Sequence, residues 1–313
     1  MKSFLMFISL FLLACAGSTH AVEVGNNKMP AYDSTKGGGA PFTDPATEMA
    51  FVLVKGGCYL MGDTFGDGDK DEKPPHEVCV NDFKLAKNVV TKGEFKKFAD
   101  ESGYRTEAEK GDGCYTWNGS TWKMDSHTNW RNPGFPQEDS HPAVCVSWND
   151  AIAFTDWMSR KSGIRYRLPT EAEWEFAARS GGKKEKFAGF SEEGQLYQYA
   201  NFCDSNCDAQ WKTVSQNDGY KYTSPVGSYK PNGLELYDMS GNVWQWVSDR
   251  YGENYYQEST KINPPGPSTG PFRVLRGGSW NFRPHHVRTT WRWWHFPVDR
   301  YGVTGFRPAI SVQ

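Results

Sequence analysis

Apolar side chains recur at helical spacing in three stretches of the chain. Before each stretch a hydroxyl residue stands three positions ahead of a carboxylate, in residues 91–94, 147–150 and 170–173. Such a pair satisfies the first free amides of a helix, so each stretch is predicted to be helical. Glycines are expected to end these helices, because a residue without Cβ adopts the left-handed conformation easily: Gly103, Gly163 and Gly181.

The remaining apolar positions predict short strands and long loops. Residues 50–54 and 59–61 are apolar runs next to glycines, which is typical of buried strands that end in turns. Between residues 181 and 235 no apolar period is present, and strands are expected only around Val214 and Val226. The sequence therefore predicts an α+β domain that is rich in loops and low in regular secondary structure.

The N-terminal residues have the pattern of an export signal. A positive start is followed by an apolar run and then by small residues, so residues 1–21 are predicted to be a signal peptide. The apolar run is too short to span a bilayer. Residues 12–15 also resemble a lipobox, although Leu13 fits it poorly, and in that alternative Cys15 would carry a lipid anchor. The expected location is periplasmic or extracellular, with an outer-membrane lipoprotein as the alternative.

Composition and charge narrow the class of protein. Residues 22–48 are rich in Gly, Pro, Ser and Asp and are predicted to be a flexible linker before a domain at 49–313. Aromatic residues make up 15% of the chain, with 13 Trp and 32 Gly, which suggests a loop-rich domain held together by rings. The net charge of −2 gives no electrostatic reason to expect nucleic acid or an anionic membrane as a partner.

Six cysteines remain after the predicted cleavage, and an even number in an exported chain favours disulfides. Sequence alone allows 15 pairings. The favoured pairs each bracket one local excursion of the chain: Cys58 with Cys79, Cys114 with Cys145, and Cys203 with Cys207. A metal site is the competing interpretation, but the close spacing of zinc knuckles is absent.

Several ordered motifs between Met49 and Ala309 are similar to those of a known family. They are GG and MG within 56–62, GYRTEAE at 103–109, HPAVCVSW at 141–148, RLPTEAEWE at 167–175, LYDMSGNVWQW at 236–246, RGGSW at 276–280 and GFRPA at 305–309. On these motifs the chain resembles the formylglycine-generating enzyme, or sulfatase-modifying factor, family. The resemblance implies a variant of the C-type lectin fold.

The residues after the GGS run depart from the family's catalysts. In those enzymes a pair of cysteines in this segment binds copper and oxidises a cysteine of the client sulfatase. Counted from Ser279, the two positions are held here by Phe282 and Val287, and no cysteine follows Cys207. Formylglycine generation through a cysteine pair is therefore not expected, nor is copper or iron as a cofactor.

The resemblance also implies two structural calcium sites. Their ligands would be oxygen atoms of side chains and backbone carbonyls, which are the hard ligands that calcium prefers. The first would combine side chains and carbonyls of four residues: Asn201, Phe202, Asp218 and Tyr220. The second would do the same with Asp238, Gly241, Val243 and Gln245. Gln245 stands where the family usually has Glu, which is expected to weaken the second site. The alternative is that these polar groups only cap turns.

The C-terminal segment, which lines the substrate cleft in the family, combines rings with cationic side chains. The candidate ligand-binding residues are Trp280, Phe282, Arg283, His286, Arg288, Trp291, Arg292 and Trp294. Such a groove suits a peptide, a glycan or a carboxylated small molecule, and the expected partner is a peptide, a protein or a small-molecule ligand. If the protein is an enzyme, Trp280, Arg283 and His286 are the candidates to line the reaction centre. The competing interpretation is that the rings fill the core.

Two further patterns are weaker. His285, His286 and His295 could hold a redox metal, but adjacent residues of an extended chain point in opposite directions, so only one of the first two would face a given ion. The acidic stretch at 66–72 lacks the spacing of a calcium-binding loop, and a solvated acidic turn is expected there.

The resulting hypothesis is an exported binding or accessory module of this family that recognises a peptide or another exported ligand in its C-terminal cleft. The alternative is an oxidoreductase of the same family that modifies a substrate other than a sulfatase by a cysteine-independent route. An enzyme needs a redox metal, a cofactor or a perturbed acid or base, whereas a binding module needs only a shaped groove.

Overall fold

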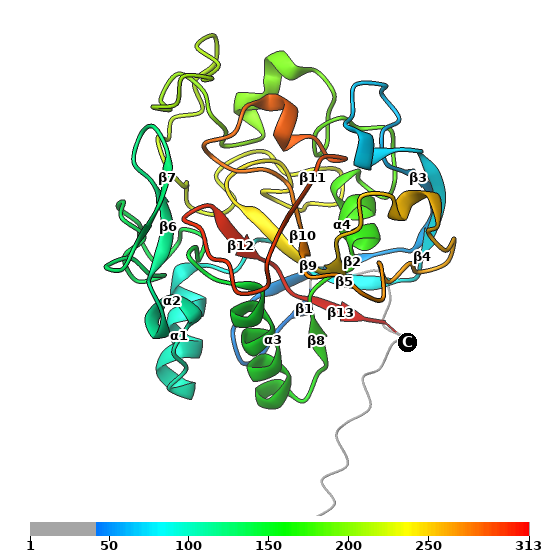
Figure 1. The fold of residues 1–313 in the computed structure, drawn as a ribbon. Helices are drawn as coiled ribbons and strands as arrows, with labels where there is room; N and C mark the ends of the chain where they lie inside the picture. The colour runs from blue at the N-terminus through cyan, green and yellow to red at the C-terminus, as the bar shows by residue number, and fades with distance from the viewer. Residues whose placement is uncertain (1–41, 313) are drawn as a thin grey trace, which may run out of the picture. The chain divides into compact units, whose positions relative to one another are not determined.

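Two sheets provide the frame of the domain (Figure 1). The computed structural model describes residues 42–312, so the predicted signal peptide, Cys15 and most of the predicted linker lie outside the described residues. The first sheet has the order β1 (Phe42–Thr43), β2 (Ala50–Val54), β5 (Phe83–Ala86), β13 (Ala309–Ser311), β8 (Tyr166–Arg167). The second has the order β11 (Arg292–His295), β10 (Arg273–Arg276), β9 (Trp244–Arg250), β12 (Thr304–Phe306).

Residues 42–48 belong to the packed domain and not to a linker. The short strand β1 pairs with β2, and the buried carboxylate of Asp44 accepts a hydrogen bond from the Tyr166 hydroxyl at 2.7 Å. The predicted boundary of the linker at 48 was therefore too late. A two-residue strand is too short to show a period in the sequence, and one buried carboxylate gives no pattern of its own.

The three predicted helices are confirmed, each with the expected capping box. They are α1 (Lys92–Ser102), α3 (Trp148–Ser162) and α4 (Glu171–Ala178). Gly103 and Gly163 end α1 and α3 in the left-handed conformation. Helix α4 stops at Ala178, before the expected Gly181, and a short helix that was not predicted, α2 (Glu107–Lys110), begins at a capping box of its own.

Loops and two small hairpins complete the domain. The hairpins are β3 (Gly57–Met61) with β4 (His76–Val80), and β6 (Cys114–Trp117) with β7 (Trp122–Asp125). The expected strands around Val214 and Val226 do not form in this part of the described chain. Val214 is exposed, and Val226 is held instead by a hydrogen bond from its amide to the Ser140 carbonyl.

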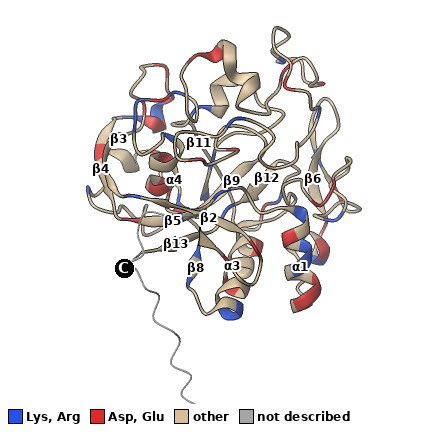
Figure 2. Ribbon diagram, turned by 180° about the vertical axis from the view of Figure 1, so that it is seen from behind, with Lys and Arg blue, Asp and Glu red and all other residues tan. Residues whose placement is uncertain are grey.

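Aromatic rings and disulfides supply the cohesion that the short ladders lack. One core cluster joins α1, α3 and the second sheet through rings that include Phe95, Phe154, Trp246 and Phe306. All three predicted disulfides are present: Cys58–Cys79, Cys114–Cys145 and Cys203–Cys207. Acidic and basic residues are interspersed along the ribbon (Figure 2). None of the helices within residues 42–312 is long and apolar enough to cross a membrane.

Candidate functional site

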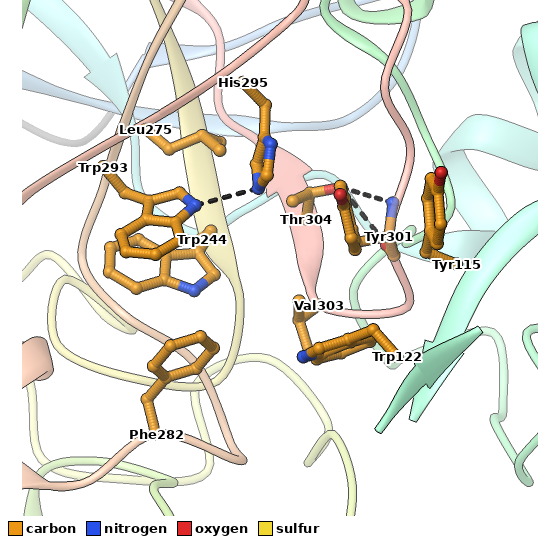
Figure 3. A pocket seen from close by; sticks show the side chains of 10 residues that line it. All are labelled: Tyr115, Trp122, Trp244, Leu275, Phe282, Trp293, His295, Tyr301, Val303 and Thr304. Carbon is orange, nitrogen blue, oxygen red and sulfur yellow. Dashed lines mark hydrogen bonds between the residues drawn. The ribbon is translucent and has the colours of Figure 1, made fainter. Parts of the chain in front are cut away.

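An aromatic cavity lies where the edge of the second sheet meets the β6–β7 hairpin (Figure 3). Its volume is about 300 Å³. Seven of its ten lining residues carry a ring, and the full set is Tyr115, Trp122, Trp244, Leu275, Phe282, Trp293, His295, Tyr301, Val303 and Thr304. We call this space the aromatic cavity. It is enclosed by residues that are far apart in the sequence.

Strand register decides which rings reach the aromatic cavity. Trp293 and His295 are two positions apart on β11 and share its inner face, and Leu275 of β10 lies opposite Trp293. Trp294, between them, points the other way and packs on Phe272 with ring centroids 4.1 Å apart. At the other edge of the sheet, Thr304 of β12 pairs with Trp244 of β9, and both residues line the aromatic cavity.

Rings stacked on one another close the side of the aromatic cavity next to the hairpin. Tyr301 lies between His295 and Tyr115, with centroid separations of 4.5 and 4.7 Å. Burial, helped by the nearby Asp299, raises the pKa of the Tyr301 hydroxyl well above its usual range. Tyr301 is therefore a neutral phenol at physiological pH, which can donate a hydrogen bond but cannot act as an anion.

His295 is the only imidazole among the residues that line the aromatic cavity. The Trp293 indole donates to His295 Nε2 at 2.8 Å, and Nδ1 lies 3.4 Å from an Asp299 carboxylate oxygen. The two contacts favour the tautomer with its proton on Nδ1, because Nε2 accepts. The imidazole is thus held in one orientation at the wall of the cavity.

The predicted cationic groove does not exist as such. Arg288 and Arg292 are buried, and each makes a two-pronged ion pair, Arg288 with Glu72 at 2.7 and 2.8 Å and Arg292 with Glu171 at 2.7 and 2.9 Å. Their guanidinium groups therefore hold the protein together and are not free to bind a ligand. A single sequence shows the arginines but not the distant carboxylates that pair with them.

The predicted rings of the groove are also divided among different surroundings. Phe282 lines the aromatic cavity, whereas Trp280 is buried against Phe135 and Tyr222. Trp291 is buried, and its indole donates to Asp69 at 3.1 Å. Trp294 lies on the opposite face of β11, and Arg283 is exposed and is not among the lining residues. Of the eight predicted residues, Phe282 alone lines the aromatic cavity.

The three histidines do not form a metal site. Within residues 42–312, the only group of His, Cys, Asp and Glu with ligand atoms close enough to share an ion is Cys58, Glu77 and Cys79, and both cysteines are disulfide-bonded. His286 packs edge-on against Trp291, away from His295. Burial, with help from His285 and Arg283, lowers the pKa of His286 to about 4, so the ring is neutral at physiological pH.

The acidic stretch at 66–72 is exposed at Asp67 and Asp69, as expected of a solvated turn, but not at Glu72. Glu72 is completely buried in its ion pair with Arg288, Asp67 pairs with Lys186 at 2.6 Å, and Asp69 accepts from Trp291. The prediction of a solvated turn missed these partners, and with them the burial of Glu72, because they come from segments more than a hundred residues away. This loop fixes the C-terminal segment that carries Phe282.

The residues of the first expected calcium site lie together and fit a cation. Asn201 Oδ1 is buried and has no hydrogen-bond partner among the described residues. The Asp218 carboxylate accepts from the backbone amides of Phe202 at 2.8 Å and Tyr220 at 2.9 Å, and burial raises its pKa to about 7. An orphaned oxygen beside a buried carboxylate is the donor set that calcium would satisfy.

In the second expected calcium site, the Gln245 side chain is not free to bind a cation. The Gln245 side-chain oxygen already accepts from the Trp174 indole at 2.9 Å and from the Arg307 guanidinium at 2.7 Å. The Gln245 amide donates to the carbonyl of Asp238 at 2.6 Å. The Gln245 oxygen is thus already occupied by an indole and a guanidinium donor, so the structure does not support Gln245 as a calcium ligand.

Most residues of the aromatic cavity were missed by sequence reasoning. The alternation of β11 separates Trp293 and His295 from Trp294, and this period of two was a usable signal in the sequence. Tyr115 and Trp122 lie on the β6–β7 hairpin, more than a hundred residues from the C-terminal segment. Nothing in a single sequence indicates that this hairpin closes the cavity.

Comparison with known proteins gives one consistent result. A family model described as sulfatase-modifying factor enzyme 1-like domain matches residues 39–312. The formylglycine-generating enzyme of Streptomyces coelicolor is 34% identical over 300 residues, which cover 87% of this chain and 93% of that protein. A Mus musculus protein named inactive C-alpha-formylglycine-generating enzyme 2 is 33% identical over 299 residues, which cover 85% of this chain and 87% of that protein.

A solved structure shows the same fold. PvdO from Pseudomonas aeruginosa matches with a TM-score of 0.71 at 28% identity, covering 88% of this chain and 98% of that chain. The predicted loop-rich α+β fold, a variant of the C-type lectin fold, is thereby confirmed.

Proposed function

The chain belongs to the sulfatase-modifying factor enzyme 1-like family, and we propose that it uses this scaffold to bind a ligand in the aromatic cavity, without thiol chemistry. The observation that carries the proposal is Phe282. This ring lines the cavity at a position where the resemblance to the family's catalysts places a cysteine. Because no cysteine follows Cys207, the segment around the cavity has no thiol to bind copper.

The geometry of the cavity supports binding. Ligand sites are concave, mostly apolar and lined by rings with a few polar groups, and the aromatic cavity has each of these properties. At about 300 Å³ it can hold a small molecule or one side chain of a peptide. A relative of similar length whose name marks it as inactive supports the idea that the scaffold persists without the family reaction.

The ligand is proposed to be extracytoplasmic. Three disulfides support export, because such bonds form and persist in oxidising compartments. The signal-peptide pattern at 1–21 supports it as well.

A second candidate is an enzyme of the same scaffold that works without cysteines. The His295–Asp299 pair favours it, because a carboxylate orients the imidazole at the cavity wall, and His295 Nε2 would act as a general base once a bound ligand displaces the Trp293 indole from it. Turnover of a bound ligand that is lost on His295→Gln would identify this alternative. Binding without turnover supports the binding module.

Filling the aromatic cavity is expected to abolish ligand binding. Val303 is buried in its wall, so Val303→Phe would place a ring in the space. In a ligand-observed NMR screen of small-molecule fragments, compounds that bind the wild-type protein should fail to bind V303F. Val298→Phe is the matched control, since Val298 is exposed and lies outside the cavity. Equal binding by wild-type protein and V303F would refute the proposed function.

We also propose that calcium occupies the first site, held by Asn201 and Asp218 with the Phe202 and Tyr220 carbonyls, where it would fix the loops around the disulfide Cys203–Cys207. Elemental analysis of untagged mature protein should then find about one calcium per chain. Asn201→Ala should remove most of it, whereas Asn217→Ala, a change in the same loop, should not. Calcium-free wild-type protein with unchanged thermal stability in a chelator would contradict this assignment.

A further inference from the structure

Two indole N–H groups at the aromatic cavity lack an acceptor. Trp244 is almost fully buried, and its Nε1 has no hydrogen-bond partner within the described part of the chain. Trp122 Nε1 also makes no hydrogen bond to any described residue, while its ring lines the opposite side. Figure 3 shows both nitrogens on the sides of the rings that face the cavity. The buried Trp244 donor without an acceptor costs about 1 to 3 kcal/mol, and the half-buried Trp122 donor costs less, so an acceptor oxygen from a ligand would be stabilised here.

The rest of the cavity wall favours positive charge. Tryptophan faces attract cations most strongly, and the walls carry three tryptophans with Phe282, whereas Tyr301 is stacked between His295 and Tyr115 and offers no free face. Among the described residues, no Lys or Arg lines the cavity, and the Asp299 carboxylate stands directly behind His295. A cation would therefore meet π-electron density without a competing positive side chain.

Together, these observations favour a small ligand that carries both an acceptor oxygen for the indoles and a positive charge for the aromatic faces. A carboxylate alone would accept from the two indoles, but it would bring an uncompensated charge into an apolar space. A cation alone would leave both indole donors unpaired. A sugar would need more hydrogen-bonding groups than this wall offers. The volume of about 300 Å³ is at the small end for ligand sites and suits a compact molecule.

We propose that the aromatic cavity binds a betaine, a small zwitterion with a quaternary ammonium group held by the aromatic faces and a carboxylate that accepts from the Trp122 and Trp244 indoles. This proposal rests on the proposed function, because it specifies the ligand of the same cavity. The ammonium carries no N–H and needs no acceptor, which matches a wall with few acceptors.

Isothermal titration with three probes tests both halves of the ligand. Glycine betaine has both charges, 3,3-dimethylbutanoate replaces its nitrogen by carbon, and choline replaces its carboxylate by a hydroxymethyl group. Glycine betaine is expected to bind at least about fivefold more tightly than the carbon isostere, because the isostere loses the cation–π attraction. It should also bind at least about fivefold more tightly than choline, which offers the two indoles a weaker acceptor.

Single-ring variants test the two donors. Trp122→Phe and Trp244→Phe keep a ring but remove the N–H, and each should weaken glycine betaine binding about fivefold. Trp122 is half-buried, so it provides the test if W244F fails to fold. Trp294→Phe is the matched control and should bind like the wild-type protein, since Trp294 lies on the other face of β11.

The outcomes separate this proposal from the one on which it rests. If the isostere binds as tightly as glycine betaine, or if W122F and W244F both bind it normally, the betaine assignment is wrong. If no betaine binds while other fragments still distinguish the wild-type protein from V303F, the cavity is a ligand site for another class. If V303F changes the binding of no compound, both proposals fail.

Discussion

Replacing Arg276 by methionine is expected to lower the free energy of unfolding by about 3 to 5 kcal/mol. Arg276 is fully buried, and its guanidinium donates to Glu175 at 2.6 Å, to Glu171 at 3.3 Å and to the Thr289 carbonyl at 2.7 Å. The variant would leave Glu175 with a buried charge that its remaining partner, Arg179, only partly compensates. The loss would be large because an unpaired buried charge is costly.

Acid titration should reveal the same network. Burial alone would raise the pKa of Glu171, but Arg292 and Arg276 outweigh it and hold this pKa below its ordinary value. The folded state therefore binds fewer protons than the unfolded chain near pH 4, and the stabilisation is lost as the pH falls through the lowered pKa.

Urea denaturation with a matched variant measures the effect of Arg276→Met. Lys96→Met removes a cation from an exposed pair with Asp100 on α1, which should cost less than about 1 kcal/mol. Similar losses in R276M and K96M would show that the buried network adds little to stability.

Gly278→Ala is expected to cost about 3 kcal/mol or more, although it adds a single methyl group. Gly278 has a φ of +75°, and a Cβ there would lie 2.5 Å from Val287 Cγ1 and 2.7 Å from the His286 carbonyl oxygen. The backbone after the GGS run would have to move, and with it Phe282. The second glycine of the GGS run thus has a physical role: without a Cβ, it lets the backbone at 286–287 approach closely, in the segment that carries Phe282.

A second glycine isolates the cause. Gly103 at the end of α1 has a similar φ of +66°, but a Cβ at this position would meet no atom within 4 Å, so Gly103→Ala should cost only about 1 to 2 kcal/mol. Thermal unfolding of both variants gives the difference. Equal losses would mean that conformational strain, and not close approach, determines the requirement for Gly278.

Local patterns predicted the local structure well. The hydroxyl–carboxylate pairs at Thr91, Ser147 and Thr170 each begin a helix, because a capping box is satisfied within four residues. The disulfide pairs were also found, since each closes a short excursion. The strands expected near Val214 and Val226 are absent because isolated valines in a polar stretch have no neighbouring strand to pair with.

The candidate site was predicted less well, for a physical reason. Arg288 and Arg292 were expected to bind a ligand, but Glu72 and Glu171, which are far away in the sequence, neutralise them in the core. Trp122 was not expected at all, because only the tertiary fold brings its hairpin to the C-terminal segment. Long-range pairing of this kind leaves no period or spacing in a single sequence.

The most direct test of the account is whether the protein oxidises a cysteine. Copper-loaded mature protein would be incubated in air with a cysteine peptide carrying a sulfatase motif, and the peptide would be followed by mass spectrometry. The formylglycine-generating enzyme of Streptomyces coelicolor serves as the positive control. The peptide is expected to keep its cysteine with this protein, while the control converts it to formylglycine. Conversion to formylglycine by this protein would contradict the claim that its cavity works without thiol chemistry.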